Sequence, residues 1–386
     1  MTVYGAVTLL AIPRKEWRSV PVNDPTGSDG ASVDSSLTTS STGEQPDAIV
    51  DELMLDDVMS RPSAQLIEQI GSGTGDLVVL GAGGKMGPTI VRMAHRAFLA
   101  SGRQGSVIAV SRFSDRGVYE SFKTLGVQTQ VGDLLDPNFL SSLPDAPDVV
   151  FMAGRKFGST GAEHLTWAMN AYLPGLVADR YRDARIVVFS TGAVYPFTTI
   201  DSGGADEDTP PEPIGEYAQS CLARERMFAF AADAWGTQVA TIRLSYALDL
   251  RYGVLVDIAE SVRDGRPVDL GMGAVSVIWQ GDACDLILRS LDHVSTPPFV
   301  LNVSGPQPVS VTDLAVGMGE LLGIDPVFEG EAPTTALILN CFRMAQTVGD
   351  PEVSIRRVMD WTCRWLQTNG RTLGKPTHFN VRDGKF

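Results

Sequence analysis

Residues 76–87 read DLVVLGAGGKMG, and this stretch decides the fold. Residues 76–80 have the apolar composition of a short buried strand, and a helical pattern opens at residue 87. The turn between them carries G-x-x-G-x-x-G at Gly81, Gly84 and Gly87. In such a turn the first glycine permits the bend, the second lets the backbone approach a pyrophosphate, and the third lets helix pack on strand. The stretch predicts a dinucleotide-binding unit that includes Lys85 and Met86; a plain glycine-rich turn is the alternative.

Short apolar runs alternate with helical patterns on the C-terminal side of this unit. The expected strands are 76–80, 106–111, 127–131, 148–153, 185–190 and 238–243, with helices at 87–100, 115–125, 163–180 and 216–235 between them. This alternation predicts an α/β fold, a doubly wound parallel Rossmann sheet. The later helical patterns, at 253–264, 282–293, 311–322 and 352–368, predict a smaller C-terminal substrate lobe over the carboxyl ends of the strands.

These patterns divide the chain into five parts. Residues 1–48 are expected to be a flexible tail, because residues 21–48 are rich in Ser, Thr, Gly, Asp and Pro and show no apolar period; a docking segment is the alternative. A helical lead-in follows over 49–75, then the Rossmann domain over 76–245. The substrate lobe takes most of 246–370, and 371–386 is expected to be a C-terminal tail.

Composition narrows the classes of partner. A net charge of −15 argues against nucleic acid and anionic membranes, while a local basic pocket stays compatible with it. The four cysteines and four histidines are scattered, which predicts no metal site and no disulfide framework and favours a cytoplasmic protein. No apolar run approaches the ~20 residues of a membrane span. Residues 3–12 are apolar but lack the basic start of a signal peptide.

The end of the second expected strand bears on the choice of cofactor. It reads Val110-Ser111-Arg112, without the acid that accepts the ribose hydroxyls of NAD. Arg112 suits a 2′-phosphate, so NADP is favoured and NAD stays possible. A surface charge, or stacking on adenine, is the alternative for Arg112. Asp133 and Leu134 follow the third strand, where an acid can accept from the adenine amino group or cap the next segment.

Residues 76 to about 368 resemble the extended short-chain dehydrogenase/reductase family, also called NAD-dependent epimerase/dehydratase. The motifs that carry the resemblance are the glycine loop, Asp133-Leu134, Asn170, the run 189–195 (FSTGAVY), Tyr217 at the start of a helix, and the run 300–305 (VLNVSG). The resemblance implies an NAD(P)-dependent oxidoreductase or epimerase that acts on a secondary alcohol or ketone.

The resemblance also implies roles for single residues. Thr191 corresponds to the hydroxyl that holds the substrate oxygen, with Ser190 as the alternate donor, and Tyr217 to the catalytic acid/base. Asn170 corresponds to the helix residue that holds a structural water near the site. The alternatives are a satisfied strand-end hydroxyl for Thr191, a packed tyrosine for Tyr217 and a routine helix polar residue for Asn170.

One position departs from the family. Tyr217-Ala218-Gln219-Ser220-Cys221 has a cysteine where the family has the lysine of Tyr-x-x-x-Lys, and a thiol supplies no positive charge to lower the pKa of the tyrosine. The thiol itself is expected to be a packed small hydrophobe.

A replacement cation is expected in the loop after the fourth strand. By resemblance Ala153, Gly154 and Lys156 pass the cofactor there, and Lys156 binds its phosphate or tunes the tyrosine. Arg155 is the runner-up, and solvent exposure of one of the two cations is the alternative.

The substrate is less well defined. The run 274–282 lacks the arginine that helps related proteins hold a nucleotide-sugar diphosphate, which favours a small sugar, polyol or sugar acid. Arg251 can pair with a substrate carboxylate or form a salt bridge between lobes; Arg243 and Tyr252 lie in the same substrate-loop region. Trp279 can line the pocket or belong to the core.

Two other kinds of function stay open beside the oxidoreductase. One is a catalytically silent NAD(P)-binding sensor or scaffold. The other is a non-redox lyase or isomerase with tightly held cofactor. A homodimer is also expected, built on the helices 163–180 and 216–235 as is common in the family. The apolar residues on their faces are Leu165, Ala168, Leu173, Leu222, Met227 and Phe230.

Overall fold

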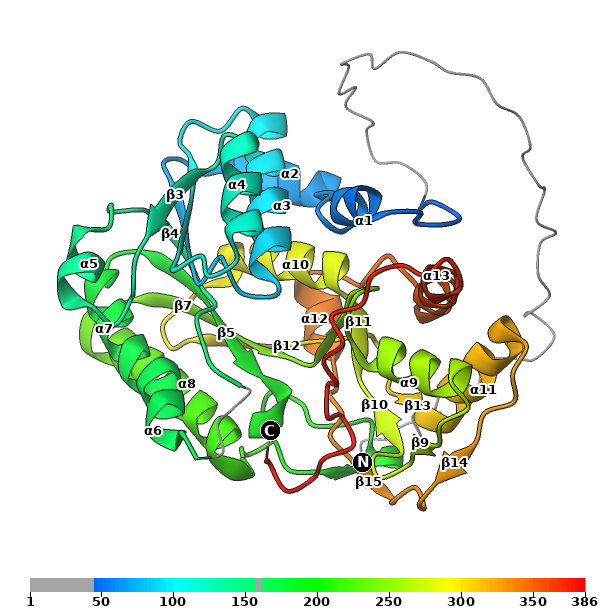
Figure 1. Cartoon of the computed structure of the whole chain (residues 1–386). Helices are drawn as coiled ribbons and strands as arrows, with labels where there is room; N and C mark the ends of the chain where they lie inside the picture. Colours follow the sequence, from blue (N-terminus) through cyan, green and yellow to red (C-terminus); the bar gives the residue numbers. More distant parts are fainter. Residues whose placement is uncertain (1–44, 157–160, 386) are drawn as a thin grey trace, which may run out of the picture.

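A seven-stranded sheet forms the centre of the molecule (Figure 1). The computed structural model describes residues 45–156 and 161–385. The strand order is β12-β7-β5-β4-β1-β2-β3, and every pairing is parallel. The strands are β1 (Leu77–Leu80), β2 (Val107–Ser111), β3 (Gln128–Val131), β4 (Asp148–Phe151), β5 (Arg185–Thr191), β7 (Gln238–Leu244) and β12 (Phe299–Val303). The predicted Rossmann sheet is confirmed.

Helices cover both faces of this sheet, as the buried strands require. One face packs on α2 (Ala64–Ser72), α3 (Gly87–Ser101), α4 (Arg116–Thr124) and α10 (Gln280–Arg289). The other packs on α5 (Pro137–Ser142), α7 (Leu173–Arg180) and α8 (Gly215–Trp235). Between α6 (Glu163–Trp167) and α7 the chain makes a π-helical turn, Ala168–Tyr172. Because α10 and β12 return to the sheet from beyond residue 245, the two lobes are not consecutive in sequence.

Local capping explains where many of these helices begin. Ser63, Asp115, Asp136, Ser310 and Ser354 each accept a hydrogen bond from a backbone N–H in the first turn of the helix that follows. Such a bond satisfies a donor that the helix itself leaves unpaired. The polar residues that precede the apolar patterns therefore set the helix starts.

The C-terminal lobe has its own hydrophobic core, in which Trp279 and Trp361 meet edge to face with ring centroids 5.2 Å apart. Its helices are α9 (Val254–Arg263), α11 (Val311–Leu322) and α13 (Ile355–Gln367), and α1 (Glu52–Met59) adds residues to the same core. The short helix α12 (Phe342–Thr347) packs on β12 of the central sheet. Four short pairs of strands complete the lobe: β8 (Tyr246–Leu248) with β11 (Val277–Trp279), β10 (Ala274–Val275) with β13 (Val309–Ser310), β9 (Val268–Asp269) with β14 (Phe328–Glu329), and β6 (Thr198–Thr199) with β15 (Thr335–Ala336).

Both expected tails make contacts where the structure describes them. At the N-terminal side, the carbonyl of Pro46 accepts from Trp361 Nε1 at 2.9 Å. The C-terminal segment 371–385 forms a strap across the lobe, drawn in red in Figure 1. Along it, Leu373 N donates to Arg251 O at 2.8 Å, Thr377 N donates to Asp257 at 2.8 Å, and Arg382 donates to Thr335 O at 2.9 Å. Residues 371–385 are thus part of the lobe; the remainder of the expected N-terminal tail lies outside the described residues.

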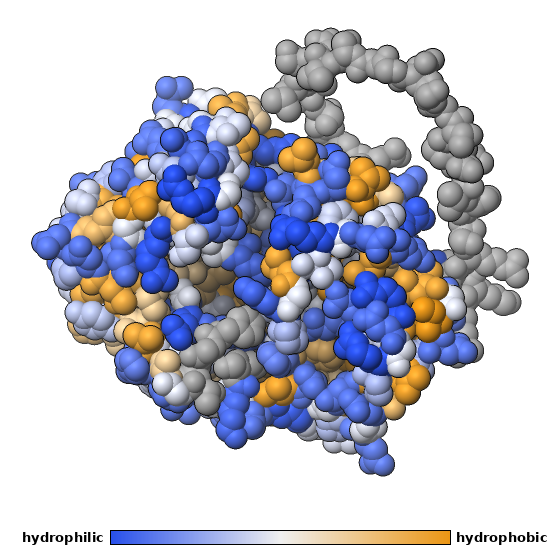
Figure 2. Space-filling view, in the orientation of Figure 1, coloured by the Kyte–Doolittle hydropathy of each residue, from blue (hydrophilic) through white to orange (hydrophobic). Residues whose placement is uncertain are grey.

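The surface is mostly hydrophilic, with scattered apolar side chains (Figure 2). Large exposed apolar residues gather on α6, the π-helical turn and α8: Leu165, Trp167, Tyr172, Met227, Phe230 and Trp235. Leu173, expected on this face, is instead fully buried against the sheet. In the part of the chain that the structure describes, no helix has the length and apolar character to cross a membrane, and no group of side chains is arranged to hold a metal ion.

Candidate active site

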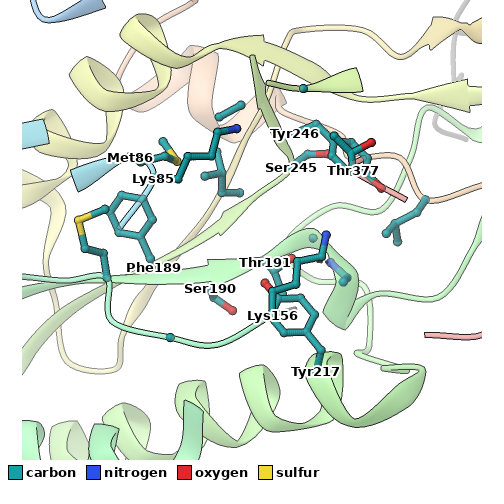
Figure 3. A pocket seen from close by; sticks show the side chains of 18 of the residues that line it. Lys85, Met86, Lys156, Phe189, Ser190, Thr191, Tyr217, Ser245, Tyr246 and Thr377 are labelled. Carbon is teal, nitrogen blue, oxygen red and sulfur yellow. Dashed lines mark hydrogen bonds between the residues drawn. The ribbon is translucent and has the colours of Figure 1, made fainter. Parts of the chain in front are cut away.

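A cavity of about 310 Å³ opens at the carboxyl ends of the strands, between the sheet and the C-terminal lobe (Figure 3). The loops after β1, β4, β5 and β7 line it, together with the start of α8 and two residues of the C-terminal strap, Thr377 and Val381. Ligands bind in this position in open α/β sheets.

The glycine loop has the backbone shape of a phosphate cradle. Gly81 has φ +98°, and a Cβ there would lie 2.6 Å from the backbone N of Ala153. A Cβ on Gly87 would lie 2.1 Å from the carbonyl O of Ala82, so only glycine lets α3 approach β1 this closely. Met86 makes no side-chain cap at the start of α3; Gly87 N donates to Gly84 O at 3.1 Å within the loop, and Pro88 has no N–H to donate. The loop therefore fits a dinucleotide pyrophosphate.

The expected adenosine end of the site is open. Arg112 is exposed at the end of β2, and no ion pair ties it to another described residue. Asp133 is exposed, and its carboxylate accepts from Leu135 N at 3.0 Å within its own turn. Leu134 is buried against β4 and α5. This bond closes a local turn, and the helix that follows, α5, is capped by Asp136 instead.

Thr191 and Tyr217 meet on the floor of the cavity, 26 residues apart in sequence. Thr191 ends β5, and Tyr217 lies in the first turn of α8. The Tyr217 side chain hydrogen-bonds to Thr191 and to Cys221. Burial raises the pKa of Tyr217 far above its ordinary value, whereas the Arg224 guanidinium and the Thr191 hydrogen bond oppose that rise.

Two polar residues beside this pair are engaged in a buried network. Ser190 Oγ donates to Glu225 at 2.5 Å, and Glu225 pairs with Arg243 at 2.8 Å. Arg243 donates to the hydroxyl of Tyr195 at 2.7 Å, which in turn donates to Asn302 at 2.9 Å. The network joins β5, α8, β7 and β12 beneath the cavity. Arg243 therefore forms a buried ion pair on β7 and does not lie in a loop that could contact substrate.

Asn170 holds the loop after β4 in place. Its amide accepts from Arg155 N and donates to Arg155 O, both at 2.8 Å, and also donates to Ser220 on α8 at 3.0 Å. It lies in the π-helical turn, a kind of distortion that is frequent at functional sites. These bonds fix the loop that carries Gly154, Arg155 and Lys156 into the cavity.

Lys156 reaches into the cavity from this loop (Figure 3). Its Nζ lies 5.7 Å from the ring centroid of Tyr217 and 5.8 Å from that of Tyr246. Burial lowers the pKa of Lys156 to about 8. The structure thus brings Lys156 together with Thr191 and Tyr217.

The chain also matches known proteins in sequence and in fold. Residues 77–302, more than half of the chain, match the model of the NAD-dependent epimerase/dehydratase family. The chain belongs to this family. It is therefore an enzyme of a nicotinamide-dependent class, and the expected family is confirmed. No curated protein matches the chain.

Similar solved structures share the fold at low identity. UDP-glucose 4-epimerase from Thermotoga maritima, solved with UDP-glucose, has 17% identity and a TM-score of 0.64, over 76% of this chain and 99% of its own. UDP-glucose 4-epimerase from Thermus thermophilus, in complex with NAD, has 19% identity and a TM-score of 0.62 over the same shares. An epimerase from Methanothermobacter thermautotrophicus has 14% identity and a TM-score of 0.64, over 79% and 96%.

Two expected substrate residues of this family member lie outside the cavity lining. Arg251 is held in ion pairs with Asp249, Asp56 and Glu52 at 3.0–3.4 Å, which ties α1 to the C-terminal lobe. Trp279 is buried against Trp361. The structure favours the alternatives for both: a structural ion pair for Arg251 and a core position for Trp279.

Two basic residues have roles in the cavity that the sequence did not suggest. Lys85, assigned to the cofactor loop, points across the cavity, and its Nζ lies 3.5 Å from the ring centroid of Tyr252 in the C-terminal lobe. Surrounding protein lowers the pKa of Lys85 to about 7, although its side chain keeps contact with water in the open cavity.

Arg224 is buried and also lines the cavity. It follows Tyr217 by seven residues and Cys221 by three. The sequence contains one sign of this position: Arg224 lies seven residues after Tyr217, so on a helix the two side chains project from the same face.

Proposed function

We propose that this enzyme transfers a hydride at a secondary alcohol or ketone of a small sugar, polyol or sugar acid, as an NAD(P)-dependent oxidoreductase or epimerase. The observation that carries the proposal is the contact of Thr191 with Tyr217 on the cavity floor, beside a backbone loop that fits a pyrophosphate. A hydroxyl donor and a proton carrier then face the same substrate oxygen.

The side chains divide the chemistry between them. Thr191 donates a hydrogen bond to the substrate oxygen and fixes its position. Tyr217 takes the proton from an alcohol oxygen, or returns it to a ketone oxygen. The nicotinamide, when bound, supplies the hydride exchange at the carbon. Met152 and Phe189 line the cavity with apolar surface, which limits water around the reacting atoms.

The charge of the cavity favours a sugar acid among the three substrate classes. Lys85, Arg155, Lys156 and Arg224 line the cavity, and no Asp or Glu of the described residues does. This is unusual for a chain of net charge −15 and suits an anionic ligand. Lys85 faces Tyr252 on the lobe side, so we assign the substrate carboxylate to Lys85 and Lys156 rather than to Arg251.

For the cofactor we propose NADP, with NAD as the alternative. The support is the exposed guanidinium of Arg112 at the end of β2, where an acid would otherwise select NAD. Asp133 and Leu134 remain assigned to the adenine side. The neighbouring structure from Thermus thermophilus was solved with NAD, which makes the comparison of both cofactors the first measurement to carry out.

One observation favours a second function, a nucleotide-binding sensor or scaffold without turnover. Cys221 stands where the family has its catalytic lysine, and burial raises the pKa of this thiol, so it remains neutral. The experiment is a fluorescence titration with NADPH and NADH, followed by a panel of sugars, polyols and sugar acids assayed in both directions. Binding with turnover that Tyr217→Phe abolishes supports the oxidoreductase. Binding without turnover of any compound favours the sensor, and cofactor retained through purification favours a lyase or isomerase.

We also propose a cytoplasmic homodimer. Leu165, Met227 and Phe230 are 43, 36 and 58% exposed on adjacent helices, and burying such a surface stabilises association. The four described cysteines are buried and unpaired, as suits a reducing compartment. Light scattering that gives the mass of a monomer at every concentration would refute the dimer, and Phe230→Glu is the variant that should dissociate it.

A further inference from the structure

We infer that Arg224 supplies to Tyr217 the positive charge that the family's lysine supplies, from one helical turn further along α8. The inference rests on the proposed acid/base role of Tyr217. It assigns a positioning residue for the reaction rather than a group that touches the substrate. It also explains how an enzyme of this family can carry Cys221.

The helix places the three residues in one row. Tyr217, Cys221 and Arg224 follow one another at i, i+4 and i+7 within α8, so their side chains lie on the same face. Cys221 is 1% exposed and Arg224 is 5% exposed. A cysteine is much shorter than a lysine, which leaves room for a longer side chain from the next turn to reach the cavity.

The guanidinium is fixed by neutral acceptors. Its Nη1 donates to the carbonyl of Phe189 at 2.6 Å, and its Nη2 donates to Asn170 Oδ1 at 3.0 Å. Both acceptors belong to elements that frame the active site: Phe189 precedes Thr191 on β5, and Asn170 holds the loop after β4. Arg224 Nε is buried without a hydrogen-bond partner. The neighbouring acid on the helix, Glu225, pairs with Arg243 instead.

Consequently, no carboxylate of the described residues neutralises Arg224 by an ion pair. A buried guanidinium that stays charged and unpaired acts on the titratable groups nearest to it. Those groups are Tyr217 and Cys221, and the charge lowers the pKa of both, against the effect of burial.

Gly154 provides the space that the guanidinium needs. A Cβ at position 154 would lie 2.6 Å from Arg224 Nη2 and 3.1 Å from Asn170 Oδ1. The loop after β4 can therefore pass the guanidinium only with a glycine at this point. The same side chain lines the cavity, so its charge acts inside the site rather than in the core beneath it.

The test begins with the pH–rate profile of alcohol oxidation, in which the tyrosinate is the base. Arg224→Met should move the rising limb to higher pH by about one unit and slow turnover about tenfold at pH 7, because loss of the cation raises the pKa of Tyr217. Arg226→Met is the matched control, since Arg226 is an exposed arginine on the same helix. Cofactor affinity and the melting temperature are measured for each variant.

Rescue separates charge from packing. Cys221→Lys restores the family's cation, so Cys221→Lys combined with Arg224→Met should recover both the rate and the position of the limb. Arg224→Lys, which keeps the charge, should lie closer to the parent than Arg224→Gln. The inference would be overturned if the rising limb of the pH–rate profile of Arg224→Gln stayed at the pH of the parent. It would also be overturned if the double variant turned over no faster than Arg224→Met.

A measurement without turnover keeps this test independent of the proposed function. In protein labelled with [13Cζ]tyrosine and saturated with NAD+, the Tyr217 resonance is assigned with Tyr217→Phe and followed against pH. We expect the Tyr217 resonance to begin to shift at least about one pH unit lower in the parent than in Arg224→Gln. Arg224→Lys keeps the positive charge, so its resonance should shift over the same pH range as that of the parent. Identical curves for parent and Arg224→Gln would overturn the role of Arg224, whereas the expected shift in a protein that turns over no substrate would overturn only the proposed function.

Discussion

The two ends of the cavity are built in different ways. At the phosphate end, seven consecutive residues, Gly81 to Gly87, make the cradle from backbone shape alone. At the proposed proton-transfer end, Thr191, Tyr217 and Arg224 come from two elements and would act through their side chains, and Arg224 donates to Asn170 and to the carbonyl of Phe189. An added Cβ at Gly81 or Gly87 would clash with neighbouring backbone at the first end, whereas we propose that at the second end Arg224 supplies the charge that Cys221 lacks.

The largest effect is expected at the proton-transfer end. Tyr217→Phe should lower turnover by ~10²–10⁴-fold, because the substrate oxygen loses its acid/base group, while cofactor affinity stays within about twofold. Steady-state rates and a fluorescence titration check both parts. A variant that keeps most of its activity would remove Tyr217 from the mechanism and break the comparison at this end.

At the phosphate end the backbone itself is the target. Gly87→Ala should weaken cofactor binding at least about tenfold and lower the melting temperature, because its Cβ would lie 2.1 Å from Ala82 O and force α3 away from β1. Gly175→Ala is the control, since the nearest atom to a Cβ there is Met227 Sδ at 3.7 Å. Because alanine favours a helix more than glycine does, Gly175→Ala should not lower the melting temperature, and equal losses in the two variants would contradict the close-packing argument.

We propose that the side chain of Arg112 governs the choice between NADP and NAD. NADPH should bind more tightly than NADH, and Arg112→Asp should narrow or reverse the difference, with a loss of roughly 1.5–3 kcal/mol, about tenfold or more, for NADPH. Titration of both cofactors measures it, with Arg116→Asp as a control because Arg116 already pairs with Glu120. Equal affinities of the parent for both cofactors would remove the NADP assignment.

The smallest effect concerns the substrate side. A sugar acid should bind best below about pH 7 and lose up to about tenfold in affinity per pH unit above it. A bound anion favours the charged amine of Lys85, so binding takes up a proton once the free amine is neutral. The pKa of the Lys85 amine also depends on the charges of its neighbours, and it sets the pH at which the affinity begins to fall. These neighbours are Asp249, Asp257, Arg251 and Lys156. Calorimetry at several values of pH checks this, with the matching neutral sugar and Lys85→Met as controls; affinity that rises with pH would contradict it.

The sequence by itself determined the Rossmann sheet, the phosphate loop and the start of α8. These features depend on local patterns: apolar runs, glycine spacing, and polar caps such as Ser63 and Ser310 directly before a helix. The pairing of Thr191 with Tyr217 was also within reach, because parallel strands present their carboxyl ends on one edge of the sheet.

Only the tertiary structure decided which charged residues face the cavity. Arg251 and Arg243 looked suited to a substrate, yet carboxylates from distant segments, Asp56 and Glu225, hold them. Lys85 meets Tyr252, and the strap brings Thr377 over the site from the end of the chain. A charged side chain pairs with the opposite charge that the fold places next to it, and the periodicity of the sequence does not show which residue that is. The same reason hid Arg224, whose access to Tyr217 depends on the small side chain at 221 and on the absent one at 154.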